Sequence, residues 1–171
     1  MAYIPDNPDL YETLTGFQYV NFIADMYEVP IRKRKENIKK YSEMFEMYDN
    51  LGNIIESYSH GMKQKLAIIA AFIHEPKILI MDEPFVGLDP KASYILKSLM
   101  KDFCSKGNSV LFSTHVLEVA QEICSRVAII KKGTLMINKQ TKELKDNKQN
   151  LEKIFLDIAN EGDTVYHEKD N

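Results

Sequence analysis

The stretch ILIMDEPFVGLDP, residues 78–90, carries the pattern from which the fold of this chain is inferred. Four apolar residues end in two adjacent acids, Asp82 and Glu83. A short apolar run followed by turn residues is typical of a buried strand, and parallel sheets bind ligands in the crevice at the carboxyl ends of their strands. We therefore expect Asp82 to hold a magnesium ion through water and Glu83 to polarise a water for attack on a phosphate. Because an apolar run followed by two acids is common, a strand end without this chemistry stays an alternative.

Helices and strands alternate on both sides of this stretch. Apolar runs predict strands at residues 77–81, 109–114, 126–130 and 134–138. Periodic segments predict helices at residues 60–74, 91–103 and 116–123, the first capped by Ser59 and the second by Asp89 with a proline after it. This alternation predicts an α/β core with a parallel sheet.

The first third of the chain has a different pattern. Residues 1–8 contain Pro5 and Pro8 and are expected to form extended chain or loop. Residues 9–57 are expected to be helical, with one helix after the capping box Thr15–Gln18 and a second from residue 31 to 48. The first helix is expected to have Tyr19, Phe22, Ile23 and Met26 on one face. The apolar residues of the second are Ile38, Tyr41 and Phe45.

Composition limits the classes of protein to consider. The formal net charge of −3 gives no argument for nucleic acid as a partner. Cys104 and Cys124 have no metal-ligand spacing and are expected to be reduced core residues. The longest apolar run, residues 66–73, is far shorter than the ~20 residues of a membrane helix, and no signal peptide is recognised. These features predict a soluble cytoplasmic protein.

Two further segments carry candidate binding residues. In YSHGMKQK, residues 58–65, Ser59 and Gly61 begin a helix whose free N–H groups and dipole favour an anion. In FSTH, His115 follows the 109–114 strand and is placed to bond a terminal phosphate. An ordinary serine cap and a surface histidine are the respective alternatives.

The order and spacing of these segments resemble the nucleotide-binding subunit of ATP-binding-cassette (ABC) transporters. Residues 58–62 resemble the signature, usually L-S-G-G-Q, and residues 78–82 resemble the Walker B strand. Residues 87–90 resemble the D-loop, and His115 is similar to the switch histidine. The resemblance runs from residue 3 to about residue 155, with LEKIFLDIA near its end similar to export-type subunits.

The resemblance implies a fold and a set of roles. The fold would be the C-terminal part of a P-loop NTPase core, a parallel sheet with flanking helices, plus a helical subdomain. The segments would be a Q-loop segment at 1–8, the helical subdomain at 9–57, a partial core at 58–138 and a C-terminal extension at 139–171. ATP and Mg²⁺ would be the cofactors. The implied residues are Glu83 and His115 for catalysis, Ser59, Gly61 and Asp89 for the nucleotide, and Asp82 and Asp6 for the metal.

Three departures from the family pattern concern single residues. His60 replaces the first signature glycine, Met62 replaces the glutamine, and Asp6 stands at the position of the Q-loop glutamine. An aspartate cannot donate a hydrogen bond as an amide does, so Asp6 would contact the magnesium shell or a water.

A fourth departure concerns the phosphate-binding loop. Its pattern, G-x-x-x-x-G-K-[ST], is absent, because none of the glycines at 16, 52, 61, 87, 107, 133 and 162 precedes a lysine. We expect a truncated chain that begins at the Q-loop and neither binds ATP tightly nor hydrolyses it alone. The resemblance implies that the strand before this loop lies between those at 109–114 and 126–130. Without it, we expect the 109–114 strand to have an unpaired edge and the 126–130 strand to be separated from the sheet. Unpaired edges pair with other chains, so we expect a chain that is marginally stable, dimerises or aggregates.

Three functions stay open from the sequence. The first is an ATPase subunit of a membrane exporter, with membrane subunits and a second ATPase subunit as partners, at the inner face of the cell membrane. The second is a non-catalytic module that supplies the signature side of a site to an intact partner and docks through residues 9–57. The third, a DNA-repair or translation-associated ABC ATPase, lacks the expected coiled-coil insertion or second cassette.

Overall fold

The computed structural model describes residues 1–146 and 151–160, which fall into two compact units. The first unit spans Met1–Ser113 and the second begins at Thr114. The first contains β1 (Ala2–Ile4), α1 (Gly16–Met26), α2 (Ile31–Met44), α3 (His60–Ile73), β2 (Ile78–Met81), α4 (Pro90–Ser105) and β3 (Ser109–Phe112), with short 3-10 helices at Tyr48–Asn50 and Ile55–Ser57. The second contains α5 (Leu117–Ile123), β4 (Arg126–Lys131), β5 (Thr134–Gln140), α6 (Thr141–Asp146) and α7 (Leu151–Asn160).

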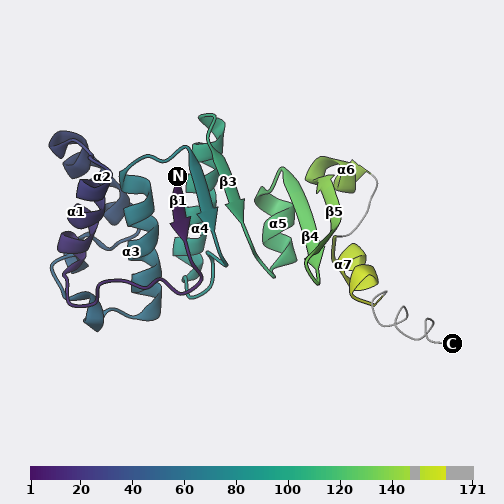
Figure 1. The fold of residues 1–171 in the computed structure, drawn as a ribbon, viewed down its shortest axis with the longest axis horizontal. Helices are drawn as coiled ribbons and strands as arrows, with labels where there is room; N and C mark the ends of the chain where they lie inside the picture. The colour runs from purple at the N-terminus through teal and green to yellow at the C-terminus, as the bar shows by residue number, and fades with distance from the viewer. Residues whose placement is uncertain (147–150, 161–171) are drawn as a thin grey trace. The chain divides into compact units, whose positions relative to one another are not determined.

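The first unit is built on a parallel sheet of order β1-β2-β3 (Figure 1). Ala2 lies opposite Leu79, and Leu79 lies opposite Val110. The parallel sheet predicted from the apolar runs is therefore confirmed. Strand β1 falls within residues 1–8, where extended chain or loop was expected, and its pairing with β2 was not predicted. Three residues before a proline give little local signal, and the strand forms because β2 supplies its hydrogen bonds.

Helices cover one face of this sheet. Leu79 and Met81 of β2 are buried, whereas Leu111 of β3 is 67% exposed on the other face. Helix α3 contacts β1 and α4 contacts β3, and the two helices meet through the edge-to-face rings of Phe72 and Phe103. The core of the first unit therefore lies between α3, α4 and the sheet.

Helix α1 contacts α3, and its N-terminal turn lies close to Tyr58 and Leu51. The predicted capping box of Thr15 and Gln18 is confirmed by both of its hydrogen bonds. Of the predicted apolar face, Tyr19 and Ile23 are half-buried, but the fully buried residues are Gly16, Val20 and Ala24. A side chain on Gly16 would lie 2.5 Å from the Tyr58 hydroxyl, so the helix approaches closely on its small side and leaves Phe22 and Met26 exposed.

Helix α2 packs on α3 with the face that the sequence predicts, because Ile38, Tyr41 and Phe45 are all buried. The helix ends at Met44, four residues before the predicted end. Glu46 takes a left-handed conformation with φ of 55°, which interrupts the helix.

The second unit contains an antiparallel pair, β4 and β5, joined by a turn at Lys132 and Gly133. Both predicted strands and the predicted turn are confirmed. Its core consists of Ala120, Val127, Ile129, Leu144 and Leu151. Among the described strands β4 pairs with β5 alone and β3 pairs with β2 alone, which matches the expected edge and the expected separation.

Other expectations differ from the structure or fall outside it. Cys104 is exposed, so its predicted core position is wrong, whereas Cys124 is half-buried and packs against the core of the second unit. In the described ranges no helix has the length and apolarity to cross a membrane. The polar end after α7 and part of the extension predicted at 139–171 lie outside the described residues. The predicted division into four functional segments stays a prediction.

Candidate functional site

The carboxyl ends of the three parallel strands meet at one edge of the sheet. The Asp82 N–H donates to the Ile4 carbonyl at 2.8 Å, and the Ser113 N–H donates to the Met81 carbonyl at 3.0 Å. Asp82 and Ser113 are the first residues after β2 and β3, and both lie at this edge. The position predicted for Asp82 in the sheet is thus the one observed.

Ser113 links the two acids that follow β2. Its hydroxyl donates to the Asp82 carboxylate and accepts a hydrogen bond of 3.1 Å from the Glu83 N–H. Glu83 has φ of 42°, an uncommon conformation for this residue type, in the first turn after the strand. Sequence reasoning used the FSTH segment only for its histidine and missed Ser113. The signal is the strand register, which places Met81 opposite Phe112 and so makes the following residues neighbours.

The acids at this edge suit a hydrated ion better than a fully protein-bound one. Asp82 and Glu83 are half-buried, and the described residues contain no group of three His, Cys, Asp or Glu side chains that could enclose a metal. Magnesium commonly binds one or two carboxylates and completes its octahedron with water and phosphate oxygens. Asp82 fits such a ligand. Asp6 is exposed in the loop after β1, and its predicted role as a second ligand stays a prediction.

The helix start predicted to bind an anion lies beside the loop that precedes α4. The Ser59 hydroxyl caps α3 by accepting from the Met62 N–H at 3.3 Å. A Cβ atom added to Gly61 would lie 2.6 Å from the Gly87 carbonyl oxygen, and one added to Gly87 would lie 2.4 Å from a ring carbon of His60. The segment at 59–62 and the GLDP segment are therefore in close contact within one chain.

Asp89 has two partners in the chain. One carboxylate oxygen caps α4 by accepting from the Ala92 N–H at 2.8 Å, and the other lies 2.7 Å from the Lys65 ammonium. The Lys65 hydrogen bond, followed by the Ala92 N–H, holds the pKa of Asp89 below its usual value. Asp89 thus stabilises the loop, and its predicted contact with the nucleotide stays a prediction.

His115 belongs to the second unit and is exposed. It precedes α5, where the Val116 N–H donates to the Thr114 hydroxyl at 3.1 Å. The structure therefore gathers Asp82, Glu83 and Ser113 at one edge and Ser59, Gly61 and Asp89 around one loop. The catalytic role predicted for His115 stays a prediction.

Comparisons with known proteins agree with this arrangement. A family model described as "AAA domain, putative AbiEii toxin, Type IV TA system" matches residues 11–119, which is more than half of the chain. The chain is 33% identical over 164 residues to the ABC-type transporter ATP-binding protein EcsA of Bacillus subtilis, covering 94% of this chain and 66% of that protein. It is 34% identical over 149 residues to the uncharacterized ABC transporter ATP-binding protein YxlF of the same organism, covering 87% and 50%.

Solved structures give the same result. The structure of an ATP-binding subunit of an ABC transporter superposes with a TM-score of 0.87 at 30% identity, covering 92% of this chain and 68% of that one. An ATP-binding cassette, MJ0796, solved as a dimer bound to ADP and phosphate, superposes with a TM-score of 0.72 at 22% identity over 81% and 62%, which supports the fold alone.

The fold and the strand-end acids define the class of the protein as an α/β nucleotide-binding domain of the P-loop NTPase type. The chain belongs to the family of ABC transporter ATP-binding proteins. It spans about half the length of several curated relatives that it matches.

Proposed function

We propose that this chain supplies the signature side and the strand-end acids of an ATP site in an ABC transporter. The observation that carries it is the bridge from Ser113 to Asp82 and to the Glu83 N–H at the carboxyl edge of the sheet. A magnesium ion held by Asp82 would neutralise phosphate charge, which is the main requirement of phosphoryl transfer.

The roles of single residues follow from their positions. Asp82 would contact the ion through water, and Glu83 would orient the attacking water. Ser59 and Gly61 would bind the terminal phosphate of a nucleotide, because the first turn of α3 has unpaired N–H groups and the positive end of the helix dipole. His115 would bond the same phosphate, and Asp6 would contact the shell of the ion.

The 171 residues are not expected to hydrolyse ATP alone. They contain no G-x-x-x-x-G-K-[ST] pattern, whose N–H groups and lysine would surround the phosphates. We propose that this loop comes from a second ATPase subunit, to which the chain presents Ser59 and Gly61. Membrane subunits of the transporter, bound through residues 9–57, would hold the assembly at the inner face of the cell membrane.

Binding of a fluorescent ATP analogue with Mg²⁺ to the chain alone tests the first part of the proposal. We expect no saturation at about 1 mM nucleotide. The binding free energy would then be weaker than about −4 kcal/mol, the value that corresponds to a Kd of about 1 mM. Saturable binding that is lost on Asp82→Asn would show a phosphate site of another kind. ATP hydrolysis that disappears on Glu83→Gln would overturn the need for a second subunit.

A mixing experiment tests the signature role. An intact ABC ATPase subunit whose own signature serine is replaced by arginine would be mixed with this chain. We expect the chain to restore hydrolysis, and Ser59→Arg to abolish that rescue. Ser98→Arg, an exposed site on α4, is the control. Rescue that survives Ser59→Arg would contradict the proposal, and complex formation without rescue would favour the non-catalytic module.

A further inference from the structure

Ser113 and Asp82 lie side by side where β2 and β3 end. Met81 lies opposite Phe112 in the parallel pair, so the next residues of the two strands, Asp82 and Ser113, are also opposite each other. Successive side chains of a strand project from opposite faces of a sheet. Met81 is buried under the helices, so Asp82 projects from the other face, where the Ser113 hydroxyl meets its carboxylate.

The direction of the Ser113 hydroxyl is fixed by two neighbours. A hydroxyl has one proton, and that of Ser113 is donated to Oδ1 of Asp82. The hydroxyl oxygen accepts from the Glu83 N–H at 3.1 Å. Since an N–H can only donate, the hydroxyl proton cannot turn toward Glu83. Oδ1 of Asp82 is therefore held by Ser113 in a defined direction.

The two oxygens of Asp82 are not equivalent. Oδ1 accepts from Ser113, whereas Oδ2 has no hydrogen-bond partner within the described ranges of the chain. The carboxylate is half-buried at the carboxyl edge of the sheet. Asp82 thus offers one oxygen, and not two, to a cation or to the water bound to it.

The number of oxygens that a carboxylate offers distinguishes Mg²⁺ from Ca²⁺. Ca²⁺ takes about six to eight oxygen ligands and often binds both oxygens of one carboxylate, whereas Mg²⁺ requires an octahedron and keeps several of its waters. A carboxylate with one oxygen already bonded to a hydroxyl suits the water shell of Mg²⁺. Contact of Ca²⁺ with both oxygens would compete with Ser113 for Oδ1 of Asp82.

We propose that Ser113 is a positioning residue that makes the strand-end site prefer Mg²⁺ to Ca²⁺. The inference rests on the role proposed above for Asp82 as the residue that contacts the ion. Ser113 acts through Asp82, because its hydrogen bond occupies Oδ1 and leaves Oδ2 for the hydrated ion. Hydrogen bonds to a carboxylate that contacts a metal orient it and tune the affinity of the site.

Paramagnetic broadening by Mn²⁺ tests this inference on the 171-residue chain without nucleotide. Mn²⁺ favours oxygen ligands as Mg²⁺ and Ca²⁺ do, and a bound Mn²⁺ broadens the NMR signals of nearby amides. We expect substoichiometric Mn²⁺ to broaden the amide signals of Asp82, Glu83 and Ser113. Asp82→Asn is expected to remove this broadening.

Competition then measures the preference of the site. Mg²⁺ or Ca²⁺ is titrated against Mn²⁺, and the concentration of each that restores half of the Asp82 signal is determined. The ratio of the Ca²⁺ concentration to the Mg²⁺ concentration is the selectivity. Ser113→Ala is expected to lower this ratio about twofold to tenfold, the range that one lost hydrogen bond gives.

A matched pair of variants separates the hydroxyl from the shape of the side chain. Ser113→Thr keeps the hydroxyl and is expected to keep the ratio of wild type. Ser113→Val has the shape of threonine without the hydroxyl and is expected to lower the ratio as alanine does. Ser113 is exposed, and the pair stays informative if Ser113→Ala unfolds the chain. Variants that lose stability to urea but keep the wild-type ratio would show a structural role only and overturn the inference.

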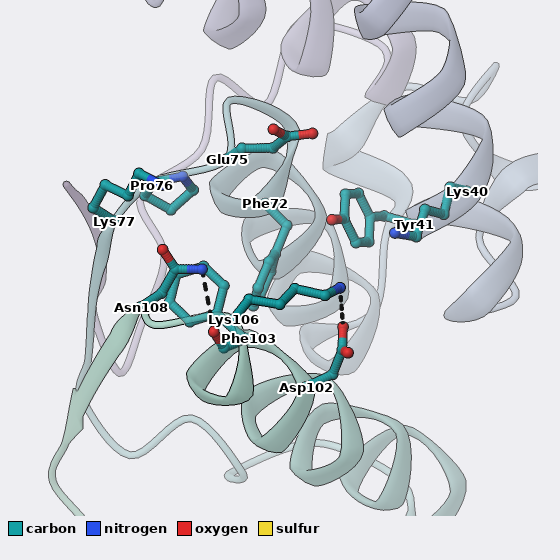
Figure 2. A pocket seen from close by; sticks show the side chains of 10 residues that line it. All are labelled: Lys40, Tyr41, Phe72, Glu75, Pro76, Lys77, Asp102, Phe103, Lys106 and Asn108. Atoms are coloured by element: carbon teal, nitrogen blue, oxygen red, sulfur yellow. Dashed lines mark hydrogen bonds and ion pairs between the residues drawn. The ribbon is translucent and has the colours of Figure 1, made fainter.

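Ser109→Ala is the control, at the other end of the same strand. Ser109 begins β3 and is exposed like Ser113. It follows Asn108, which lines a cavity of about 230 Å³ together with Lys77 and Lys106 (Figure 2). Ser109 is about 13 Å from Ser113 at the usual rise of a strand, so Ser109→Ala is expected to leave both the broadening and the ratio unchanged.

Two negative results have different meanings. No broadening at Asp82, or broadening that survives Asp82→Asn, would overturn the ion contact proposed for Asp82 and this inference with it. Broadening that requires Asp82 but gives one ratio for wild type, Ser113→Ala and Ser113→Val would overturn the role of Ser113 alone.

Discussion

The Lys65 ammonium lies 2.7 Å from a carboxylate oxygen of Asp89 and joins α3 to the start of α4. The lysine side chain is 16% exposed and the aspartate side chain 48% exposed, so the pair is only partly shielded from water. The second Asp89 oxygen accepts from the Ala92 N–H. One carboxylate thus fixes the loop between β2 and α4 relative to the helix that Ser59 begins.

Replacing Asp89 by alanine is expected to destabilise the chain by about 1–2 kcal/mol, because it removes a helix cap and an ion pair together. Urea unfolding measures this difference. Asp102→Ala is the control, since the ion pair that the described residues give Asp102 is with Lys106 one turn away, which contributes about 0.5 kcal/mol. Equal losses for the two variants would show that Asp89 does not organise the loop.

The Asp89 interaction also predicts a dependence on pH. Its pKa is lowered in the folded chain, chiefly by Lys65. The unfolded chain therefore binds the proton more readily, and the stabilisation is complete above the usual pKa of about 3.9. It is lost as the pH falls through the lower folded pKa. Asp89→Asn keeps an acceptor for the cap, so the stability difference between wild type and this variant should shrink from about pH 5 downward. A constant difference would contradict the assignment.

The contact between Gly61 and Gly87 predicts that alanine at position 61 destabilises the chain, although the position is helical. Alanine normally stabilises a helix relative to glycine by about 1 kcal/mol. At Gly61 the added Cβ would lie 2.6 Å from the Gly87 carbonyl oxygen, so Gly61→Ala is expected to cost about 1–3 kcal/mol instead.

Gly52→Ala is the matched control, because its Cβ would meet no atom within 4 Å. Thermal unfolding of both variants separates the local clash from general effects of the substitution. A Gly61→Ala variant as stable as Gly52→Ala would show that the two segments do not approach as closely as the structure has them.

The two faces of the parallel sheet predict different costs for the same substitution. Leu79 of β2 is fully buried, whereas Leu111 of β3 is 67% exposed. Leu79→Ala is expected to cost about 2–5 kcal/mol, because it leaves a cavity under α3 and α4. Leu111→Ala is expected to change stability by less than about 0.5 kcal/mol. Denaturant unfolding distinguishes them, and a large loss for Leu111→Ala would mean that its face is covered in solution.

His74 predicts a second pH effect near neutrality. Its ring stacks on Tyr27 at 3.7 Å between centroids, and burial lowers its pKa in the folded chain. The unfolded chain therefore takes up the proton first, so stability falls as the pH drops below about 6.5. It levels off below the folded pKa. His74→Gln should flatten this part of the curve, and an NMR titration of the wild-type ring should give a pKa below that of free histidine. An unchanged curve in the variant would contradict this.

Local patterns predicted much of this molecule. The apolar run before Asp82 formed a buried strand, and the caps at Thr15, Ser59 and Asp89 formed with the hydrogen bonds that their residue types favour. The turn at Gly133 joined the expected pair of strands. These features depend on residues that are neighbours along the chain, so a sequence pattern is enough to predict them.

The features that local patterns did not predict concern residues that are distant along the chain. Strand β1 has three residues and forms only because β2 lies beside it. Helix α1 turns its small residues inward, since Tyr58 leaves no room for a side chain at Gly16. Ser113 reaches Asp82 across 31 positions of sequence. No pattern within one segment contains these approaches.

The order of motifs along the chain was sufficient to identify the family by resemblance. Each motif is a contiguous segment, and its residue types follow from the chemistry of phosphate and magnesium. The bridge from Ser113 to Asp82 and the contact of Gly61 with Gly87 came from packing instead. Each depends on the register of parallel strands and on how closely two helices approach. Those quantities are set by the whole core at once, because close-packed side chains must fill a shared volume.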